Sequence, residues 1–564
     1  MADMEIEFDV EAKMRDGVVL RADVYRPTSG GPWPVLLHRT PYLRRAHSLA
    51  IFDPFQAVTR GYMVVQQDTR GRFGSDGEWL PFGYEVADGY DTVRWAATLP
   101  GSSGAVGMLG GSYTGNTQWA AAIAAPPELR AIVPRVTWCD PSDGLYFRGG
   151  AIELGLYASW SLQNGAANII RQAASDPARA WAALAGLVAD LDGLVPRGYW
   201  ELPSGALPAL ARGGQPEIGV ERALADASSA DAAAIAGKHD RVEAASFNIA
   251  GWHDIFLQGT LDNHIAMADQ GKPTRLLVGP WTHPSVTASQ GAQGGQVGEV
   301  NFGLASSPQM IDLQAPVGLL ELRWYDHWLK GTDNGVPDES PVKIFVMGTN
   351  VWREENEWPL SRAVDTPWHL RADWKLTEAA PSADEAPDSY VYDPADPAIT
   401  RGGNFVMTSE FTAGPADQRV TEARADVLVY TSDPLQEDIE VTGRVRVRLH
   451  AATDAPSTDW VVRLCDVDTE NVSRNVCDGI LRIHGTPGEP GEREIDLWST
   501  STVFLGGHRI RVQVTSSNFP RWDRNLNTGE PPRTGTTMRS ARQTVFHDTA
   551  RPSRIILPVV PGPS

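Results

Sequence analysis

The chain has few cysteines and no long apolar run, and both absences exclude classes of protein. Cys139, Cys465 and Cys477 are the three cysteines among 564 residues. They are too few and too scattered for a disulfide framework or a zinc site. No stretch approaches the roughly 20 apolar residues of a transmembrane helix, and the acidic N-terminal residues lack the basic and apolar regions of a signal peptide. A cytoplasmic protein without metal or other cofactor is expected.

Basic residues are scarce relative to acidic ones. The chain has 49 Lys and Arg against 70 Asp and Glu, a formal net charge of -21. Nucleic-acid backbones and anionic membrane surfaces would repel such a chain, so neither is expected as a partner. A small-molecule substrate is the expected partner, and the oligomeric state stays open, a homodimer included.

The length predicts several domains, and the sequence pattern changes along the chain. Short apolar runs bounded by Gly, Pro and Asp alternate with helical stretches in residues 1–139 and return in 240–349, which predicts a doubly wound α/β sheet. Residues 140–239 are rich in alanine at helical spacing, which predicts an all-helical cap inserted into that domain. Residues 350–564 carry alternating strands between turns and predict a β-sandwich.

The most informative segment is Gly110-Gly111-Ser112-Tyr113-Thr114-Gly115. A strand-like run precedes it and a helix-like run follows it. A serine between glycines at such a junction is typical of a nucleophile elbow, which exposes the hydroxyl and directs the next N–H to the same point. The second glycine comes one residue later than in the usual G-x-S-x-G motif. On these six residues alone, a flexible turn is an equally good interpretation.

Two further polar residues follow strand-like runs. One run ends at Ala250 and is followed by Asp254, and another ends at Val278 and is followed by His283. A serine hydroxyl needs a histidine to take its proton and a carboxylate to orient that histidine. The order Ser, Asp, His on three strand ends is that of α/β-hydrolases. The sequence therefore predicts the triad Ser112, Asp254 and His283.

Two neighbouring histidines and one early loop are less clear. His253 and His264 lie near Asp254, but neither has the H-E-x-x-H spacing of a metal site. The second oxyanion donor of such enzymes usually comes from the loop after an early strand, which is Arg39-Thr40-Pro41-Tyr42 here. Position alone does not decide between a donor role and a packing role for Tyr42.

Motifs along nearly the whole chain resemble one family. Besides the elbow, they comprise Thr40-Pro41-Tyr42, residues 67–71 and 74–78, 250–252 before the aspartate, 278–281 before the histidine, and 392–397, 414–419 and 517–520. With them the chain resembles the bacterial cocaine esterase group of the X-prolyl dipeptidyl peptidase and α-amino acid ester hydrolase superfamily. The resemblance implies an α/β-hydrolase domain, a helical cap and a C-terminal jelly roll.

The resemblance also implies roles for single residues. Ser112, His283 and Asp254 form the implied triad, and the Tyr42 hydroxyl and the Tyr113 N–H form the implied oxyanion hole. Four positions match residues that contact the acyl group in the family: Trp160, Phe256, Val406 and Met407. Plain core packing is an alternative for each of these four.

Two departures from the family pattern lie near the site. Thr114 and His253 stand where the cocaine esterase group has leucine and tyrosine, so different pocket walls are expected. The residues after Asp254 read Ile255-Phe256-Leu257-Gln258. Relatives that select α-amino acyl groups hold the substrate ammonium with acidic residues, some of them near the triad aspartate, and an ammonium buried without a carboxylate is costly.

The sequence thus predicts a serine carboxylesterase that hydrolyses neutral, aromatic acyl esters through an acyl-serine. Other activities that use the same triad stay open: an acyltransferase, a β-lactam or α-amino acid ester hydrolase, and an X-prolyl dipeptidyl peptidase. A non-catalytic carbohydrate-binding protein that acts through its β-sandwich is a more remote alternative.

Overall fold

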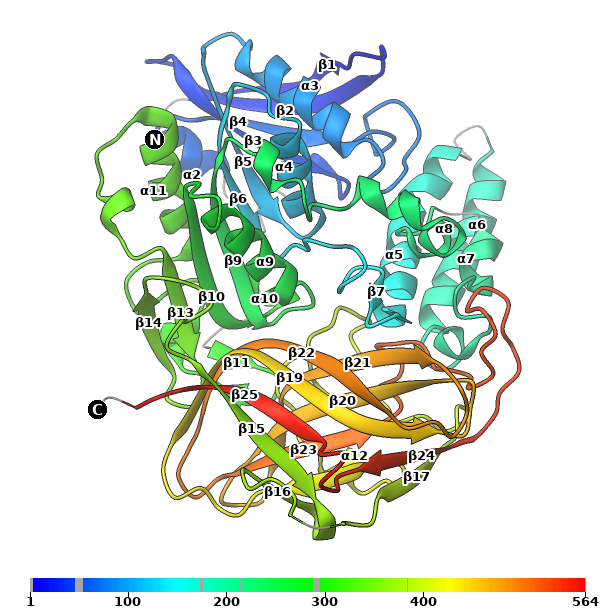
Figure 1. Cartoon of the computed structure of the whole chain (residues 1–564). Coiled ribbons are helices and arrows are strands. Elements are labelled where there is room, and N and C mark those ends of the chain that lie inside the picture. The colour runs from blue at the N-terminus through cyan, green and yellow to red at the C-terminus, as the bar shows by residue number, and fades with distance from the viewer. Residues whose placement is uncertain are drawn as a thin grey trace.

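The computed structural model describes residues 4–45, 54–172, 176–213, 216–287, 295–382 and 384–562. Parts of all four predicted domains therefore lie outside the described residues. Figure 1 shows a helix-covered sheet at the top, a group of helices beside it, and a β-sandwich below. The predicted fold class is confirmed by this arrangement.

The N-terminal sheet follows the order β1-β2-β4-β3-β5-β6-β9-β10-β13-β14. Neighbours from β4 to β13 are parallel, whereas β1, β2 and β14 extend the sheet at its edges by antiparallel pairing. The bounds are β1 (Met4–Lys13), β2 (Val19–Pro27), β3 (Trp33–Thr40), β4 (Met63–Asp68), β5 (Ser102–Gly111), β6 (Leu129–Arg135), β9 (Ala245–His253), β10 (Thr274–Thr282), β13 (Val342–Val346) and β14 (Val351–Glu355).

Helices cover both faces of this sheet because its strands present apolar side chains to both sides. Val93, Trp119 and Met267 pack on one face, and Val58 and Leu322 pack on the other. The bounds are α2 (Pro54–Thr59), α3 (Glu85–Ala97), α4 (Tyr113–Ile123), α9 (Leu257–Ala268), α10 (His283–Thr287) and α11 (Val317–Lys330).

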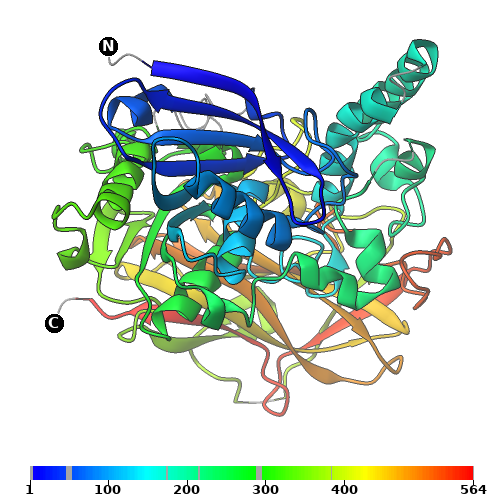
Figure 2. The same cartoon turned by 90° about the horizontal axis from the view of Figure 1, so that it is seen from above.

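The segment between β6 and β9 forms the cap. Its elements are β7 (Phe147–Arg148), β8 (Ala151–Ile152), α5 (Leu154–Gln172), α6 (Pro177–Asp192), α7 (Pro208–Gly213) and α8 (Val220–Ala225), with the short 3-10 helices Gly198–Trp200, Ala227–Ala232 and His239–Arg241. Seen from above, part of the helical cap projects outward from the body of the molecule (Figure 2). The two-residue hairpin β7–β8 departs from the all-helical prediction, since strands this short leave no alternation to read.

The C-terminal domain is rich in strands that enclose one apolar core. Its elements are β15 (Val364–Arg371), β16 (Lys375–Thr377), β17 (Asp388–Tyr392), α12 (Arg419–Glu422), β18 (Leu428–Thr431), β19 (Ile439–Thr453), β20 (Ser457–Val467), β21 (Ser473–His484), β22 (Gly491–Phe504), β23 (Arg509–Thr515), β24 (Ala541–Phe546) and β25 (Arg554–Val560). The predicted boundary at residues 349–350 falls inside the β13–β14 hairpin, which belongs to the N-terminal sheet. The domain boundaries stay predictions.

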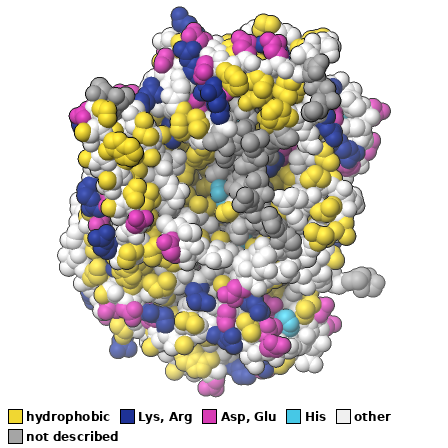
Figure 3. Space-filling view, turned by 180° about the vertical axis from the view of Figure 1, so that it is seen from behind, with side chains coloured by type: hydrophobic (Ala, Val, Ile, Leu, Met, Phe, Trp, Pro, Cys, Tyr) yellow, Lys and Arg dark blue, Asp and Glu magenta, His cyan; other side chains and the backbone are white. Residues whose placement is uncertain are grey.

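Hydrogen bonds join the sandwich to the hydrolase domain. The Met347 N–H donates to Ser501 O at 3.0 Å, and the Val503 N–H donates to Met347 O at 2.9 Å. The rear face is hollowed near its middle, and hydrophobic side chains gather around the hollow (Figure 3). Among the helices described, none is long and apolar enough to cross a membrane.

Candidate active site

Ser112 lies at the junction between β5 and α4, in a backbone conformation that side chains rarely adopt. Its φ is 59° and its ψ is -126°. A non-glycine residue in such a region costs on the order of 1–3 kcal/mol and persists only where the surroundings impose it. Ser112 is partly exposed although its neighbours are buried. The strained, accessible serine is the geometry expected of a nucleophile elbow.

The two glycines that flank the elbow fit because they have no side chain. A Cβ on Gly110, whose φ is +128°, would lie 2.3 Å from the Thr114 hydroxyl oxygen. A Cβ on Gly115 would lie 2.8 Å from the Thr137 Cβ. Both approaches are far below contact distance, so the late second glycine is required by the packing of α4 against the segment after β6.

Side-chain hydrogen bonds fix the backbone on both sides of the serine. The amide of Gln118 donates to Gly110 O at 2.9 Å and accepts from the Val133 N–H at 2.9 Å. The Thr137 hydroxyl donates to Ser112 O at 3.0 Å. Because these bonds join α4, β5 and the segment after β6, they hold the turn in its strained conformation.

Asp254 and His283 lie together at the carboxyl edge of the sheet. His283 Nδ1 is 2.6 Å from Asp254 Oδ2, and Asp254 Oδ1 accepts a hydrogen bond from the Phe256 N–H at 2.7 Å. Asp254 is fully buried, and His283 is nearly so. A buried carboxylate with this contact fixes both the tautomer and the orientation of the imidazole.

The histidine and the serine share one edge of the sheet. His283 begins α10, and this helix contacts the strand β5 that leads into Ser112. The Phe256 ring packs edge-on against the His283 ring, with centroids 5.4 Å apart. The fold thus brings the three predicted triad residues to the same end of the sheet, and their catalytic roles stay predictions.

Tyr42 and Tyr113, the two predicted oxyanion donors, are neighbours. Their rings pack edge to face with centroids 6.2 Å apart. Tyr113 is the first residue of α4, where backbone N–H groups have no partner inside the helix. The Tyr42 hydroxyl accepts a hydrogen bond from Trp160 Nε1 at 3.0 Å. Burial raises the pKa of Tyr42 to about 12, which keeps the phenol protonated.

A buried acid that the sequence reading missed anchors Tyr113. The Tyr113 hydroxyl donates to Glu85 Oε1 at 2.9 Å, and Arg39 Nη1 donates to Glu85 Oε2 at 2.8 Å. Burial raises the pKa of Glu85. Glu85 is 28 residues from Tyr113 in sequence, so no local motif could have indicated the contact.

The predicted acyl-contact residues lie in or against one apolar cluster. Trp160 on α5 stacks over the Tyr113 ring at 6.3 Å, and Phe256 and Val406 belong to the same cluster. Met407 packs instead against Gly155 at the start of α5. Trp160 and Phe256 thus contact residues of the candidate site, Tyr113 and His283. A contact of any of the four positions with an acyl group stays a prediction.

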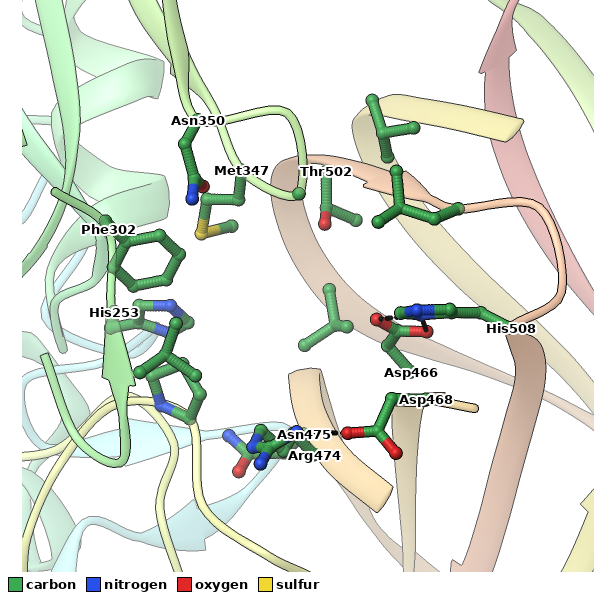
Figure 4. Close-up of a pocket in the computed structure, with 16 residues that line it drawn as sticks. His253, Phe302, Met347, Asn350, Asp466, Asp468, Arg474, Asn475, Thr502 and His508 are labelled. Carbon is green, nitrogen blue, oxygen red and sulfur yellow. Dashed lines mark hydrogen bonds and ion pairs between the residues drawn. The ribbon is translucent and has the colours of Figure 1, made fainter. Parts of the chain in front are cut away.

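His253 and His264, the two other histidines near Asp254 in the sequence, are both buried, and neither takes part in the Asp254–His283 contact. His264 Nδ1 lies 3.1 Å from the Thr274 hydroxyl. His253 lines a separate cavity that faces the β-sandwich (Figure 4).

Thr114 is buried, and its hydroxyl donates a hydrogen bond to Gly111 O at 2.8 Å. The threonine that departs from the family pattern therefore helps to hold the elbow. Within the described ranges no group of three His, Cys, Asp or Glu side chains is placed to hold a metal ion.

Asn404 is a second residue that the sequence reading missed. Its amide reaches from the sandwich domain and donates to Trp252 O at 2.9 Å and to Asp254 O at 3.2 Å. The loop that carries the candidate aspartate is therefore held by the C-terminal domain. This gives the β-sandwich a structural part in the site.

A strained serine after a central strand, with an Asp–His pair at the same sheet edge, defines a serine hydrolase of the α/β-hydrolase fold. Residues 16–285 match the X-Pro dipeptidyl-peptidase (S15 family), and residues 334–556 match the C-terminal non-catalytic domain of X-Pro dipeptidyl-peptidases. The chain belongs to this family.

Several proteins are similar to this chain over nearly their whole length. Cocaine esterase from Rhodococcus sp. (strain MB1 Bresler) is 33% identical and is covered to 98%, as is this chain. The solved structure of an α-amino acid ester hydrolase is 26% identical with a TM-score of 0.77, and covers 99% of this chain and 97% of its own. An aminopeptidase from a marine sediment Thaumarchaeota archaeon is 25% identical with a TM-score of 0.78 at the same coverage.

Proposed function

We propose that the chain hydrolyses carboxylic esters with neutral, aromatic acyl groups through an acyl-serine intermediate. That it is a serine hydrolase acting on ester bonds follows from its family and from its likeness to cocaine esterase and to an α-amino acid ester hydrolase. The observation that carries the mechanism is the 2.6 Å contact between Asp254 and His283 beside the strained Ser112. A cytoplasmic location stays a prediction.

In the proposed mechanism Ser112 Oγ attacks the ester carbonyl while His283 Nε2 takes the serine proton. Asp254 accepts from the Nδ1 side and stabilises the imidazolium that forms. The Tyr113 N–H and the Tyr42 hydroxyl donate to the oxyanion. His283 then returns the proton to the leaving alcohol, and water activated by the same histidine cleaves the acyl-serine.

Aromatic acyl groups are favoured by the composition of the neighbouring walls. Trp160, Phe256 and Tyr113 lie in one apolar cluster, and the Phe256 ring also contacts the candidate histidine. Aromatic rings pack well against such walls in offset or edge-to-face arrangements. An α-amino acyl group would bring an ammonium to the same place, where the residues after Asp254 offer no carboxylate.

Tyr42→Phe tests the proposed oxyanion donor. The substitution removes one oxygen, so kcat should fall by about 10²–10³ while KM changes little, because the lost bond strengthens only in the transition state. Trp160 loses its acceptor, which should cost about 1 kcal/mol of stability. Steady-state kinetics and a melting curve measure both effects.

A matched control for this variant is Tyr157→Phe in the cap. Tyr157 donates to Glu221 at 2.7 Å, so this variant also loses one hydrogen bond of a buried phenol. It should lose stability but keep wild-type kcat. Unchanged kcat in Tyr42→Phe would make Tyr42 a packing residue.

The acyl preference is tested with two esters that differ by one ammonium. The kcat/KM for ethyl phenylacetate should exceed that for phenylglycine ethyl ester by at least about tenfold, since an unpaired buried ammonium is costly. A preference for the phenylglycine ester would favour the second candidate, an α-amino acid ester hydrolase, which the structural likeness supports. A Gly-Pro anilide in the same assay separates a dipeptidyl peptidase from both.

A further inference from the structure

Arg72 is a buried cation in the segment between β4 and α3. It is 2% exposed, and its hydrogen-bond partners among the described residues are two backbone carbonyls and one side-chain amide oxygen. Burial lowers the pKa of Arg72 to about 10, so the guanidinium still carries its charge near pH 7. A buried cation that no carboxylate neutralises is costly. A residue kept at such a cost is a candidate for a functional role.

One contact of Arg72 holds the backbone directly before Tyr42. Arg72 Nε donates to Pro41 O at 2.7 Å, and the Tyr42 N–H donates to the Thr40 hydroxyl at 3.1 Å. The Pro41 carbonyl and the Tyr42 N–H belong to the same planar peptide group. Since both polar atoms of this peptide are bonded, the direction in which the Tyr42 side chain leaves the backbone is fixed.

A second set of contacts holds the cap helix that carries the partner of the Tyr42 hydroxyl. Arg72 Nη1 donates to Asn164 O at 3.2 Å and to Asn168 Oδ1 at 3.3 Å, both on α5. The Asn164 amide in turn donates to Trp160 O at 2.9 Å. Trp160 Nε1 donates to the Tyr42 hydroxyl at 3.0 Å. One guanidinium thus joins the Tyr42 loop to α5.

The guanidinium also stacks on an aromatic ring that lies against the same cap residue. Arg72 Cζ lies 4.1 Å from the centroid of the Trp79 ring, and the Trp79 and Trp160 rings have centroids 5.6 Å apart. A planar fork that both stacks and bonds to several acceptors is a property of arginine that lysine does not share. The contacts of Arg72 therefore converge on Tyr42 from its own loop and from the cap.

We propose that Arg72 is a positioning residue, whose guanidinium joins the Tyr42 loop to α5 and so holds the Tyr42 hydroxyl where it donates to the oxyanion. The inference rests on the proposed ester hydrolysis and adds a residue to its oxyanion hole. Arg72 acts through Tyr42, and no contact with the substrate is assigned to it. Misplacing a catalytic group by 1 Å can cost about 10²-fold in rate, which sets the scale of the expected effect.

Arg72→Met tests the inference because methionine keeps an unbranched stem but has no N–H donor. With a p-nitrophenyl ester, kcat should fall by about 10²-fold while KM changes little, since the misplaced hydroxyl matters mainly in the transition state. The decisive measurement is the same substitution in the Tyr42→Phe enzyme, which has no hydroxyl left to position. There Arg72→Met should lower kcat further by less than about threefold, because changes that act on one group are not additive. Additive losses would overturn the inference.

Arg524→Met is the matched control. Arg524 is also buried and also donates to two backbone carbonyls, to Pro394 O at 3.1 Å and to Trp200 O at 2.8 Å, which joins the sandwich to the cap. This variant should lose stability in a melting curve but keep wild-type kcat at a temperature where it is folded. A fall in its kcat equal to that of Arg72→Met would mean that any loosening of the cap slows the enzyme, and the role of Arg72 would be refuted.

Arg72→Lys separates positioning from charge, and it decides the case if Arg72→Met does not fold. Lysine keeps the charge but replaces the fork by a single ammonium, so kcat should still fall by at least about tenfold. Wild-type kcat in Arg72→Lys would overturn the inference. If Tyr42→Phe loses rate and the Arg72 variants do not, the inference fails alone. If Tyr42→Phe keeps its rate, the proposed oxyanion hole fails together with it.

Discussion

Ser112→Ala should lower kcat for a p-nitrophenyl ester by about 10⁶-fold, the scale found when a triad serine is removed from another serine hydrolase. The alanine leaves the hydrolysis with no nucleophile, and the oxyanion donors then have no acyl-serine reaction to accelerate. Stability should change little or rise. Within the described residues the Ser112 side chain makes no hydrogen bond that fixes the elbow, and Gln118 and Thr137 hold the turn through backbone atoms.

The control for this variant lies on β5, the strand that leads into the elbow. Ser103→Ala, at the exposed start of β5, makes the same chemical change far from the elbow and should keep full activity. Fluorophosphonate labelling should be lost in Ser112→Ala and retained in Ser103→Ala. Turnover that survives in Ser112→Ala would remove the serine mechanism, and absence of labelling in the wild type would favour a non-catalytic role.

The parts of the fold that were predictable are those with a local sequence pattern. The strands that lead into Ser112, Asp254 and His283 contain short apolar runs followed by Gly, and each includes the run that the pattern predicted. The elbow was predictable because only glycine fits beside Thr114 and Thr137, which leaves a visible trace in the sequence.

Two other elements were not predicted. The strand β1 does alternate between apolar and polar residues from Met4 to Lys13, but it lies at the edge of the sheet and is mostly exposed or partly exposed. The hairpin β7–β8 has two residues on each side. Strands this short depend on pairing with a neighbour and leave no periodicity to read.

Contacts between distant segments were beyond the reach of sequence reading. Trp160 bonds to Tyr42 across 118 residues, and Asn404 bonds to the backbone at Asp254 across 150 residues. Glu85 reaches Tyr113 across 28 residues. These partners depend on how the cap and the sandwich pack on the sheet, which no periodicity in one segment encodes.

Asp254→Asn should lower kcat by about 10⁴-fold while the fold survives. Asp254 accepts two hydrogen bonds, from the Phe256 N–H at 2.7 Å and from His283 Nδ1 at 2.6 Å. An asparagine has one acceptor oxygen. If that oxygen keeps the Phe256 N–H, the amide NH₂ faces His283 Nδ1 and can donate only to a ring protonated on Nε2. That tautomer cannot take the proton of Ser112.

The alternative orientation of the asparagine leads to a different cost. If the amide turns to accept from His283, its NH₂ meets the Phe256 N–H, and a buried donor loses its partner at about 1–3 kcal/mol. The fall in kcat should therefore come with little change in KM, and the remaining activity should rise at alkaline pH, where hydroxide replaces general base catalysis. Asp262→Asn, on α9 of the same domain, is the matched control and should keep its rate. An Asp254→Asn enzyme within tenfold of wild-type kcat would mean that another carboxylate orients the histidine.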